Sequence, residues 1–473
     1  MNRLLAKKWI IISCMGILLI PFGASAQNLL GDWYGTLEVQ GMKLRIVFHI
    51  QKDSGTYKTT MDSPDQGAKG IACSATKVEG NQLEIALDKI KMRYAGQFTG
   101  GVIKGTFSQS GMEFPMVLSR EAGEEEVVRR PQEPAGPLPY SAEQVYFVNK
   151  SAGGIKLAGT LTIPKGVEHP KVVILISGSG PQNRDEEVKA FHHRPFLVWS
   201  DYLTRQGIAV LRFDDRGVGE SEGSQEGATS ADFATDVESA VSYLRTRKDI
   251  GFSQIGLMGH SEGGLIAPMV AAKDQGIGFM VLLAGPGVAG DVVLRSQANR
   301  IGELSGGTKD VLEYNDRLRA KLYELVKTEP DTGLLKNKIQ EYLLSLRTNP
   351  NDQHAKEITD KMIETQVHAL CSPWLNYFIR TNPIDYLSKV HCPVLALNGD
   401  KDSQVLSEMN LKGIKKGLQL AGNNHFRIEE MKDLNHLFQT CKTGGLEEYG
   451  KIEETVSPKA MELVADWIVN GRG

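Results

Sequence analysis

The sequence has few cysteines for its length. It contains five cysteines in 473 residues, and no two of them form a Cys-x-x-Cys pair. Without paired or dense cysteines, neither a structural zinc site nor a disulfide scaffold is expected. Four of the five lie beyond the N-terminal segment, at Cys73, Cys371, Cys392 and Cys441. Their spacing allows one bridge in an oxidising compartment without selecting a pair, and free thiols are the simpler prediction.

The chain also lacks an excess of charge of either sign. Its formal net charge is -3, from 54 basic and 57 acidic residues, and it has no basic stripe or acidic tail. This balance gives no electrostatic reason to expect a nucleic-acid partner, and it suits a small or neutral substrate. Apolar residues make up 41% of the chain, which is enough for a substantial core. The length favours two domains.

Long apolar runs are missing except near the N-terminus. Basic residues precede an apolar run at 9–22, and Ala24-Ser25-Ala26 follows with small side chains. This pattern predicts an export signal at 1–26, cleaved before Gln27, and a periplasmic or extracellular protein. The run is short for a membrane span, so we expect no stable span after cleavage. A lipid anchor at Cys14 is the minor alternative.

Changes of pattern divide the mature chain into three parts. At 27–120, short alternating runs between glycine-rich or polar turns predict an all-β domain, an antiparallel barrel or sandwich. A charge run and four prolines at 121–140 predict a linker. From 141 to 473, strands alternate with helical segments, which is typical of an α/β domain with a mostly parallel sheet and helices on both faces. Within it, about residues 290–387 show helical periodicity alone and predict a helical cap.

The clearest chemical motif is Gly259-His-Ser261-Glu-Gly263, which lies between a predicted strand at 254–258 and a helical segment. A nucleophilic serine on such a turn needs neighbours without side chains, because a Cβ at either flanking position would collide. The helix that follows directs its free N–H groups towards a reacting carbonyl. In this setting the motif predicts Ser261 as a nucleophile.

A serine nucleophile requires a base and an acid that orients the base. In this fold the acid and then the histidine follow the serine along the chain, at the ends of later strands. Asp400 and Asp402 both follow the predicted strand at 393–397, and we favour Asp402, with a turn-forming role for Asp400. His436 lies after the last strand and is favoured as the base over His425, which lies at the start of that strand.

The negative charge that develops on a reacting carbonyl oxygen needs two N–H donors. The backbone N–H of Glu262, directly after the nucleophile, is one predicted donor. The other is expected in the glycine-rich loop at 177–181, where we favour the N–H of Ser179, with Gly180 as the alternative. Pro181 has no N–H and is excluded.

Five motifs follow one another along the α/β part. They are Ser177-Gly-Ser-Gly-Pro-Gln-Asn-Arg-Asp185, Asp214-Asp-Arg-Gly-Val-Gly-Glu-Ser221, Gly259-His-Ser-Glu-Gly-Gly264, Gly399-Asp-Lys-Asp402 and Leu434-Asn-His-Leu437. Together they resemble secreted bacterial α/β-hydrolases of the carboxylesterase type, which are related more distantly to serine aminopeptidases. The resemblance covers about residues 140–473 and implies an α/β-hydrolase fold with Ser261, Asp402 and His436 as its triad. One departure is Ser177, where many relatives carry histidine before the glycine. The β domain is similar, more loosely, to lipocalin-like modules found ahead of such hydrolases.

Other polar and aromatic clusters have simpler interpretations. His192-His193 and the acidic run at 185–187 suggest a metal, but adjacent histidines point in different directions on most backbones, and no metal site is predicted. Arg216 and Glu220 are expected to brace the loop beside the nucleophile. The cap also holds three aromatic residues, Trp374, Tyr377 and Phe378. They could line an acyl pocket, although packing of a helix against the sheet is the simpler explanation.

These residues predict a serine hydrolase that cleaves carboxylic esters through an acyl-enzyme intermediate, without a metal or cofactor. The expected partner is a small-molecule ester, and the sequence favours no oligomeric state. A serine peptidase or a thioesterase with the same triad is the nearest alternative, but the sequence reveals no site for a free amino terminus. The other alternative is a glycan- or surface-binding protein with a vestigial hydrolase domain. Intact Ser, Asp and His in the required order speak against it.

Overall fold

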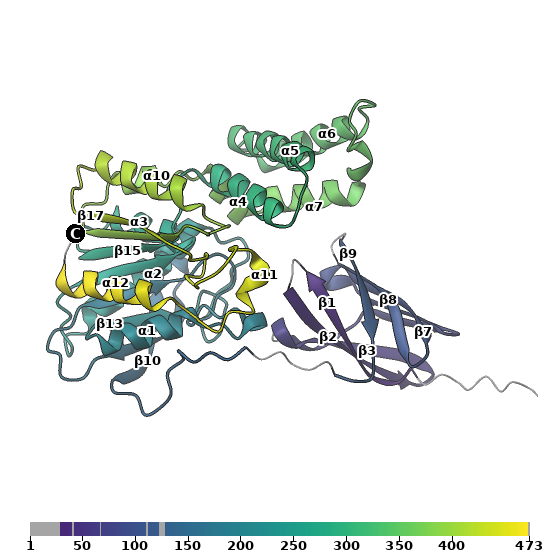
Figure 1. Cartoon of the computed structure of the whole chain (residues 1–473), viewed down its shortest axis with the longest axis horizontal. Coiled ribbons are helices and arrows are strands. Elements are labelled where there is room, and N and C mark those ends of the chain that lie inside the picture. Colours follow the sequence, from purple (N-terminus) through teal and green to yellow (C-terminus); the bar gives the residue numbers. More distant parts are fainter. Residues whose placement is uncertain (1–28, 40–41, 67, 110–111, 123–127, 472–473) are drawn as a thin grey trace, which may run out of the picture.

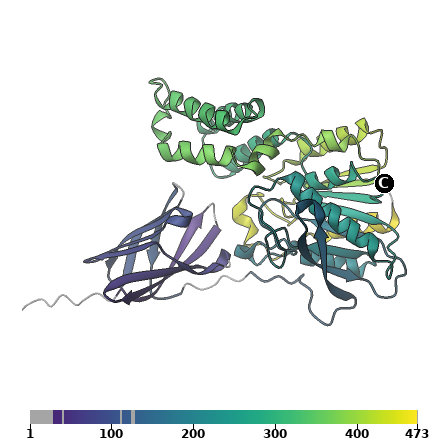
Figure 2. The same ribbon diagram turned by 180° about the vertical axis from the view of Figure 1, so that it is seen from behind.

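The computed structural model describes residues 29–39, 42–66, 68–109, 112–122 and 128–471. A β domain stands beside a larger α/β domain, and a group of helices lies over both (Figure 1); the view from behind shows the same arrangement (Figure 2). The predicted export signal at 1–26, with the alternative anchor at Cys14, lies outside the described residues. Within the described residues, no helix is both long enough and apolar enough to cross a membrane.

The N-terminal domain consists of two antiparallel sheets, with strand orders β1-β2-β3-β4 and β5-β6-β7-β8-β9. Its strands are β1 (Gly31–Val39), β2 (Met42–Asp53), β3 (Thr56–Ser63), β4 (Ala68–Ala72), β5 (Ala75–Glu79), β6 (Gln82–Leu87), β7 (Met92–Thr99), β8 (Val102–Gln109) and β9 (Met112–Leu118). Reciprocal backbone hydrogen bonds between Tyr34 and Ser119 join β1 to the end of β9. Alternate side chains point inwards. The buried core includes Trp33, Phe48, Tyr94 and Phe107. The prediction of an all-β domain is confirmed.

The α/β domain is built on an eight-stranded sheet with the order β10-β11-β13-β12-β14-β15-β16-β17. The strands are β10 (Ser141–Asn149), β11 (Ile155–Ile163), β12 (Val172–Ile176), β13 (Ala209–Phe213), β14 (Ile255–His260), β15 (Phe279–Leu283), β16 (Val394–Gly399) and β17 (Phe426–Met431). The first two pair antiparallel, and β12 to β17 pair in parallel. Both faces of β12 are buried, as a mostly parallel sheet requires. The predicted fold class is confirmed.

Helices cover both faces of this sheet. One face packs against α2 (Ser230–Thr246), α3 (Gly263–Ala271) and α10 (Ser407–Leu420), and the other against α1 (Pro195–Arg205) and α12 (Pro458–Asn470). A short α11 (Leu446–Tyr449) precedes α12. The last helix begins at Pro458, and Ser457 before it makes no side-chain capping bond. Proline at the first helical position already removes one of the N–H groups that need a partner.

Six helices lie between β15 and β16, where the sequence predicts the cap. They are α4 (Gly290–Leu304), α5 (Lys309–Thr328), α6 (Thr332–Arg347), α7 (Asp360–Leu370), α8 (Pro373–Arg380) and α9 (Ile384–Leu387). The cap has a core of its own, which includes Leu322, Val326, Ile339, Leu343 and Val367. The cap can therefore hold its shape without packing every helix on the sheet.

Part of the predicted linker lies against the α/β domain. The Arg130 guanidinium donates to the carbonyl oxygens of Phe191 and Ile452. Gln132 donates to the carbonyl oxygen of Val456 at 2.7 Å. This stretch is therefore docked and does not act as a free tether. The four cysteines among the described residues are free, with Cys441 buried and the other three half-buried.

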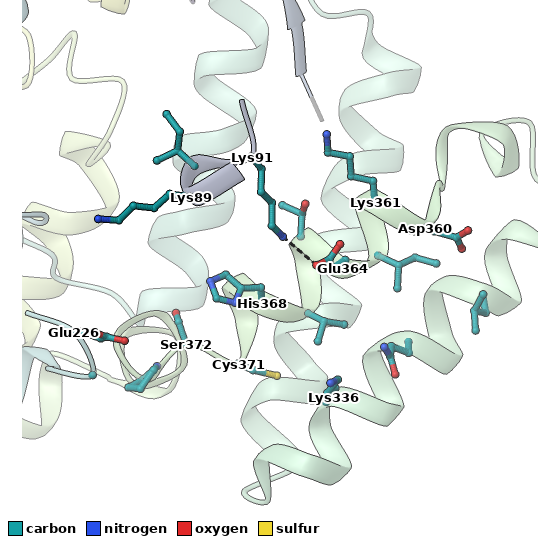
Figure 3. Close-up of a pocket in the computed structure, with 18 residues that line it drawn as sticks. Lys89, Lys91, Glu226, Lys336, Asp360, Lys361, Glu364, His368, Cys371 and Ser372 are labelled. Atoms are coloured by element: carbon teal, nitrogen blue, oxygen red, sulfur yellow. Dashed lines mark hydrogen bonds and ion pairs between the residues drawn. The ribbon is translucent and has the colours of Figure 1, made fainter. Parts of the chain in front are cut away.

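A large cavity of 1190 Å³ lies between the β domain and the cap. Figure 3 shows four lysines around it: Lys89 and Lys91 from the β domain, and Lys336 and Lys361 from the cap. The Nζ of Lys91 lies 3.0 Å from Oε1 of Glu364, an ion pair that links the two parts (Figure 3). We call this cavity the interdomain cleft.

Candidate active site

Ser261 lies on the turn between β14 and α3. Its φ is +52°, in the left-handed region that side chains rarely adopt. The neighbouring glycines are needed for space: a Cβ on Gly259 would lie 2.0 Å from the carbonyl oxygen of Gly263, and one on Gly263 would lie 2.1 Å from that of Ile176. The N–H of Ser261 donates to the carbonyl oxygen of Leu283 at 2.9 Å, which fixes the turn against β15. The sequence motif thus produces the tight turn that was expected from it.

Asp402 and His436 lie in the loops after β16 and β17. His436 Nδ1 is 2.8 Å from Asp402 Oδ2, and the two residues are only 4% and 3% exposed. The other carboxylate oxygen accepts the backbone N–H groups of Gln404 at 2.7 Å and Val405 at 2.9 Å. A carboxylate fixed in this way holds the histidine in the tautomer protonated on Nδ1. Nε2 is then available to accept a proton.

The described residues contain no hydrogen bond between the side chains of Ser261 and His436. The ring of His436 lies 4.8 Å from that of His260, the residue directly before the serine. In active sites without substrate, the hydrogen bond between the serine and the histidine is often long, and it shortens when substrate binds. The structure therefore forms one of the two hydrogen bonds of a Ser-His-Asp triad.

The two alternative residues lie apart from this arrangement. Asp400 Oδ1 accepts the backbone N–H of Asp433 at 2.7 Å, a contact that joins the loops after β16 and β17. His425 precedes β17, and its backbone N–H donates to Asn423 Oδ1 at 2.8 Å. Neither contacts Asp402 or His436 in the part of the chain that the structure describes.

Ser179 and Glu262 line the same cavity of 70 Å³ as Ser261, which we call the serine cavity. Among the described residues, the backbone N–H groups of Ser179 and Glu262 donate to no protein acceptor. Both are therefore available to an oxygen in the serine cavity. The alternative donor, Gly180, lines a separate cavity of 20 Å³.

Two carboxylates hold the loop that carries Ser179. Asp215 accepts the Ser177 hydroxyl at 2.9 Å and the Gln182 N–H at 3.0 Å. Burial raises the pKa of Asp215 to about 7. Glu186 Oε1 accepts the N–H of Gly178 at 2.7 Å. Sequence reasoning missed both carboxylates, whose only signal was a position within or beside the two loop motifs. Ser177, which stands where many relatives carry histidine, donates its hydroxyl to Asp215.

The cap supplies the wall opposite the serine. Trp374 and Phe378 line the serine cavity and stack with ring centroids 5.6 Å apart. Trp374 Nε1 also donates to Glu262 Oε1 at 2.9 Å, an oxygen that accepts the Ser230 hydroxyl as well. Burial raises the pKa of Glu262. Tyr377 does not line the serine cavity. Its hydroxyl lies 3.1 Å from that of Tyr386. Two of the three candidate aromatic residues thus face the serine.

The remaining candidates lie outside the serine cavity. Arg216 forms a buried ion pair with Asp236 at 2.7 Å, and Glu220 pairs with Arg184, so both support the loop after β13. His193 donates from Nε2 to the carbonyl oxygen of Thr455, 2.9 Å away. The described residues bring together no group of three side chains suited to binding a metal.

Sequence comparison places this site among known hydrolases. Residues 191–359 match the family model "Serine aminopeptidase, S33". The chain is 25% identical over 338 residues to esterase EstD of Thermotoga maritima, with 70% of each chain covered. It is 32% identical over 151 residues to the uncharacterized protein YfhR of Escherichia coli, covering 31% of this chain and 48% of that protein.

Solved structures give more distant likenesses. An esterase of Pyrococcus furiosus matches with 16% identity and a TM-score of 0.43, covering 73% of this chain and 99% of the other. Est1E of Butyrivibrio proteoclasticus, with ferulic acid bound, matches with 17% identity and a TM-score of 0.39, covering 69% and 98%. These likenesses are too distant to bear on activity. From its own sheet and its sequence relatives, the chain is a serine hydrolase of the α/β-hydrolase fold, related to esterases.

Proposed function

We propose that this protein hydrolyses carboxylic esters, with Ser261 as nucleophile, His436 as base and Asp402 as the acid that orients the base. The observation that carries the proposal is the serine cavity, which Ser261 lines together with Ser179 and Glu262. The backbone N–H groups of Ser179 and Glu262 donate to no acceptor in the described part of the chain. Such donors stabilise the negative oxygen of an acyl-transfer transition state. The relationship to EstD, an esterase, supports the same chemistry.

The reaction follows from this geometry. His436 Nε2 takes the proton from Ser261 as Oγ attacks the ester carbonyl, and the N–H groups of Glu262 and Ser179 bind the resulting oxyanion. His436 then protonates the departing alcohol, which leaves an acyl group on Ser261. Water attacks this acyl-enzyme with His436 again as base and releases the acid. Throughout, Asp402 stabilises the imidazolium form of the histidine.

The cavity favours esters over the substrates of an aminopeptidase. An aminopeptidase must bind the ammonium group of a free amino terminus. Among the described residues that line the serine cavity, Glu262 has the only carboxyl group. That group is 3% exposed and already accepts hydrogen bonds from Ser230 and Trp374. It therefore offers no free carboxylate to an ammonium ion, although the matched family is named for aminopeptidases.

The size of the cavity points to a short acyl group. A volume of 70 Å³ holds about five water-sized groups, and its walls include Val293, Leu294, Trp374 and Phe378. We therefore expect acetyl and butyryl esters to react faster than decanoyl esters. A thioester of the same acyl size would fit the same cavity, and it belongs in the substrate panel.

The decisive experiment is labelling with a fluorophosphonate, read by intact mass, on the mature protein and on Ser261→Ala. We expect one adduct on the native chain and none on the variant, which should lose at least about 10⁴-fold in ester hydrolysis. An ester series should then be compared with an aminoacyl anilide. If native protein gave no adduct at pH 8, the serine would not be activated, and a binding role would replace the proposed hydrolysis.

Export is proposed on the sequence of residues 1–26 alone. Its support is the basic segment, the short apolar run and the Ala-Ser-Ala site. The N-terminal mass of protein recovered from intact cells tests it, because cleavage would leave Gln27 as the first residue. Retention of residues 1–26, or a lipid on Cys14, would replace this proposal.

A further inference from the structure

A second buried pair of histidine and carboxylate lies behind the triad. His260 Nδ1 is 2.9 Å from Glu186 Oε1, and His260 Nε2 is 3.0 Å from the backbone carbonyl oxygen of His436. The residues are 7% and 6% exposed, so neither meets bulk water. The reaction steps proposed above use neither side chain. Their burial therefore needs another explanation.

The partners of His260 define its charge. Both ring nitrogens face oxygen atoms that can only accept a hydrogen bond, a carboxylate and a carbonyl. A neutral imidazole has one N–H, so it would set a lone pair against one of these oxygens. Burial lowers the pKa of His260, but the charge and hydrogen bond of Glu186 and the bond to His436 outweigh burial and raise it overall. An imidazolium satisfies both contacts.

The pair connects three segments that must be aligned for catalysis. Glu186 Oε1 also accepts the N–H of Gly178 at 2.7 Å, directly before Ser179. His260 is the residue directly before Ser261. Its other nitrogen holds the backbone of His436. A chain of hydrogen bonds thus runs from the loop at 177–181, which we call the oxyanion loop, through the turn that carries Ser261, to the loop that carries His436.

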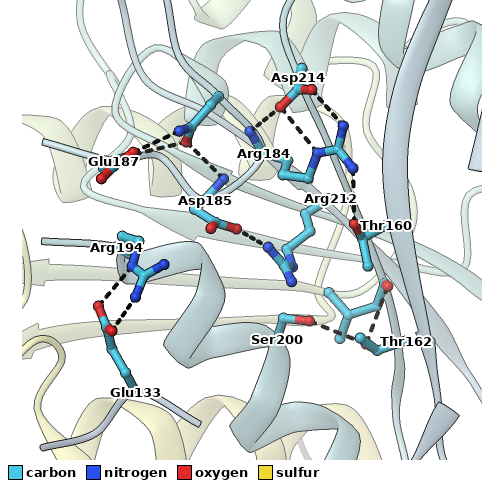
Figure 4. A network of polar contacts seen from close by, with 12 residues as sticks. Glu133, Thr160, Thr162, Arg184, Asp185, Glu187, Arg194, Ser200, Arg212 and Asp214 are labelled. Atoms are coloured by element: carbon cyan, nitrogen blue, oxygen red, sulfur yellow. Dashed lines mark hydrogen bonds and ion pairs between the residues drawn. The ribbon is translucent and has the colours of Figure 1, made fainter. Parts of the chain in front are cut away.

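The segment around Glu186 is itself held in place. Glu186 has a φ of +51°, a conformation that a residue with a side chain keeps only when its surroundings impose it. The residue before it, Asp185, forms an ion pair with Arg212 (Figure 4). The next residue back, Arg184, binds Asp214 with 2.6 Å between Nη2 and Oδ2 (Figure 4). These contacts anchor the backbone that leads into Glu186.

We propose that Glu186 and His260 are a charged pair of positioning residues, which hold the oxyanion loop and the His436 loop in register with Ser261. This inference rests on the proposed function. The pair contacts no substrate and takes no proton in the reaction. It acts by fixing the N–H of Ser179 and the ring of His436 before substrate arrives, because misplaced groups of this kind lose much of their effect.

The kinetic test uses Glu186→Gln and His260→Gln on the full mature chain. Each should lower kcat for a short ester by about 10- to 100-fold, less than the loss of an oxyanion donor outright, while KM stays within about 2-fold. The affinity for a trifluoromethyl ketone should fall by the same factor as kcat/KM, because this inhibitor needs the aligned oxyanion donors.

Two matched controls separate positioning from burial. Glu187→Gln changes the next carboxylate, which bonds the Asn183 side chain at 2.9 Å. His193→Gln removes a fully buried histidine ring whose Nε2 donates to the carbonyl oxygen of Thr455. We expect the second control to lower thermal stability and both to leave kcat within about 2-fold. If the Glu186 and His260 variants matched these controls in kcat, the proposal would be wrong.

A spectroscopic test needs no catalytic activity, and its main measurement uses the native protein. Long-range ¹H–¹⁵N spectra of the native protein at pH 7 should show protons on both ring nitrogens of His260. Glu186→Gln should leave one. A neutral His260 in the native protein would overturn the charged pair even if Ser261 reacted with fluorophosphonate. Conversely, if His260 were an imidazolium but fluorophosphonate labelled no serine, the charged pair of Glu186 and His260 would stand and the proposed ester hydrolysis would be wrong.

Discussion

The serine cavity and the interdomain cleft share a wall but differ in almost every other respect. Ser372 and Pro373 line the cleft, and Trp374, the next residue, lines the serine cavity. The first cavity measures 70 Å³ and the second 1190 Å³. Beside the serine cavity, the buried carboxylates of Glu262 and Asp402 each accept two or more hydrogen bonds. The cleft is bordered by exposed lysines, and one exposed ion pair crosses it.

The difference shows where this fold fixes atoms tightly enough for chemistry. Ser179, Ser261 and Glu262 in the serine cavity follow strands of one sheet, whose backbone hydrogen bonds set their spacing. Side chains around the cleft come from surfaces of separate units, and long lysines there keep most of their rotamer freedom. Volume is thus a poor guide to the reactive site here. Substitutions at the serine cavity should be costly, and substitutions at the cleft should be mild.

Apart from the loss of Ser261 itself, the largest effect is expected at the acid of the proposed triad. Asp402→Asn should lower kcat by about 10³- to 10⁴-fold, because an amide no longer stabilises the imidazolium or fixes its tautomer. Steady-state hydrolysis of a short ester measures this loss. Asp400→Asn is the matched control, since Asp400 only holds the Asp433 N–H. Equal losses in the two variants would remove Asp402 from the triad.

The second effect is on stability and depends on pH. The buried carboxyl of Asp215 has a pKa raised to about 7, while the unfolded chain releases this proton near 4. The native state therefore binds more protons between these values, and stability falls as pH rises from about 4 to 7 and stays lower above. Asp215→Asn cannot ionise, so its stability relative to the native chain should rise between pH 5 and pH 8.5, by up to about 2.7 kcal/mol.

Urea unfolding of both proteins at the two pH values measures this difference. Asn can keep the contacts of Asp215, accepting the Gln182 N–H through oxygen and donating to the Ser177 hydroxyl. Asp249→Asn is the control, because Asp249 is exposed and pairs with Arg247 at the surface. A stability difference between Asp215→Asn and the native chain that did not change with pH would mean that Asp215 is ionised at pH 5.

A smaller effect is expected at the shared wall. Trp374→Ala should enlarge the serine cavity and free the Glu262 carboxyl from one donor. We expect kcat/KM for an acetyl ester to fall about 10-fold, and the ratio of decanoyl to acetyl turnover to rise by at least that factor. Tyr377→Phe, on the same helix but outside the cavity, should change neither. An unchanged chain-length preference in Trp374→Ala would place the acyl pocket elsewhere.

The sequence predicted the parts of this site that depend on one strand and the loop after it. Ser261, Asp402 and His436 could be named because each follows a strand, and parallel strands end at one edge of a sheet. The glycines beside Ser261 carried a further steric signal. By contrast, Glu186 and His260 are 74 residues apart, and His260 and His436 are 176 apart. Nothing local in the chain indicates such contacts, because only the packed loops create them.

Substitutions in the interdomain cleft should have the smallest effect on activity and stability. They also test most directly the contrast between the cleft and the serine cavity. Lys91 and Glu364 are 63% and 67% exposed at their side chains, so water and salt screen their attraction. Lys91→Ala and Glu364→Gln should leave kcat/KM within about 2-fold and should not change the thermal midpoint measurably. A loss of activity in both variants would show that the β domain acts on the serine cavity through α7 and α8, since Ser372 to Trp374 form the wall that the two cavities share. The cleft would then be part of the catalytic machinery, and the contrast drawn from exposure and volume would fail.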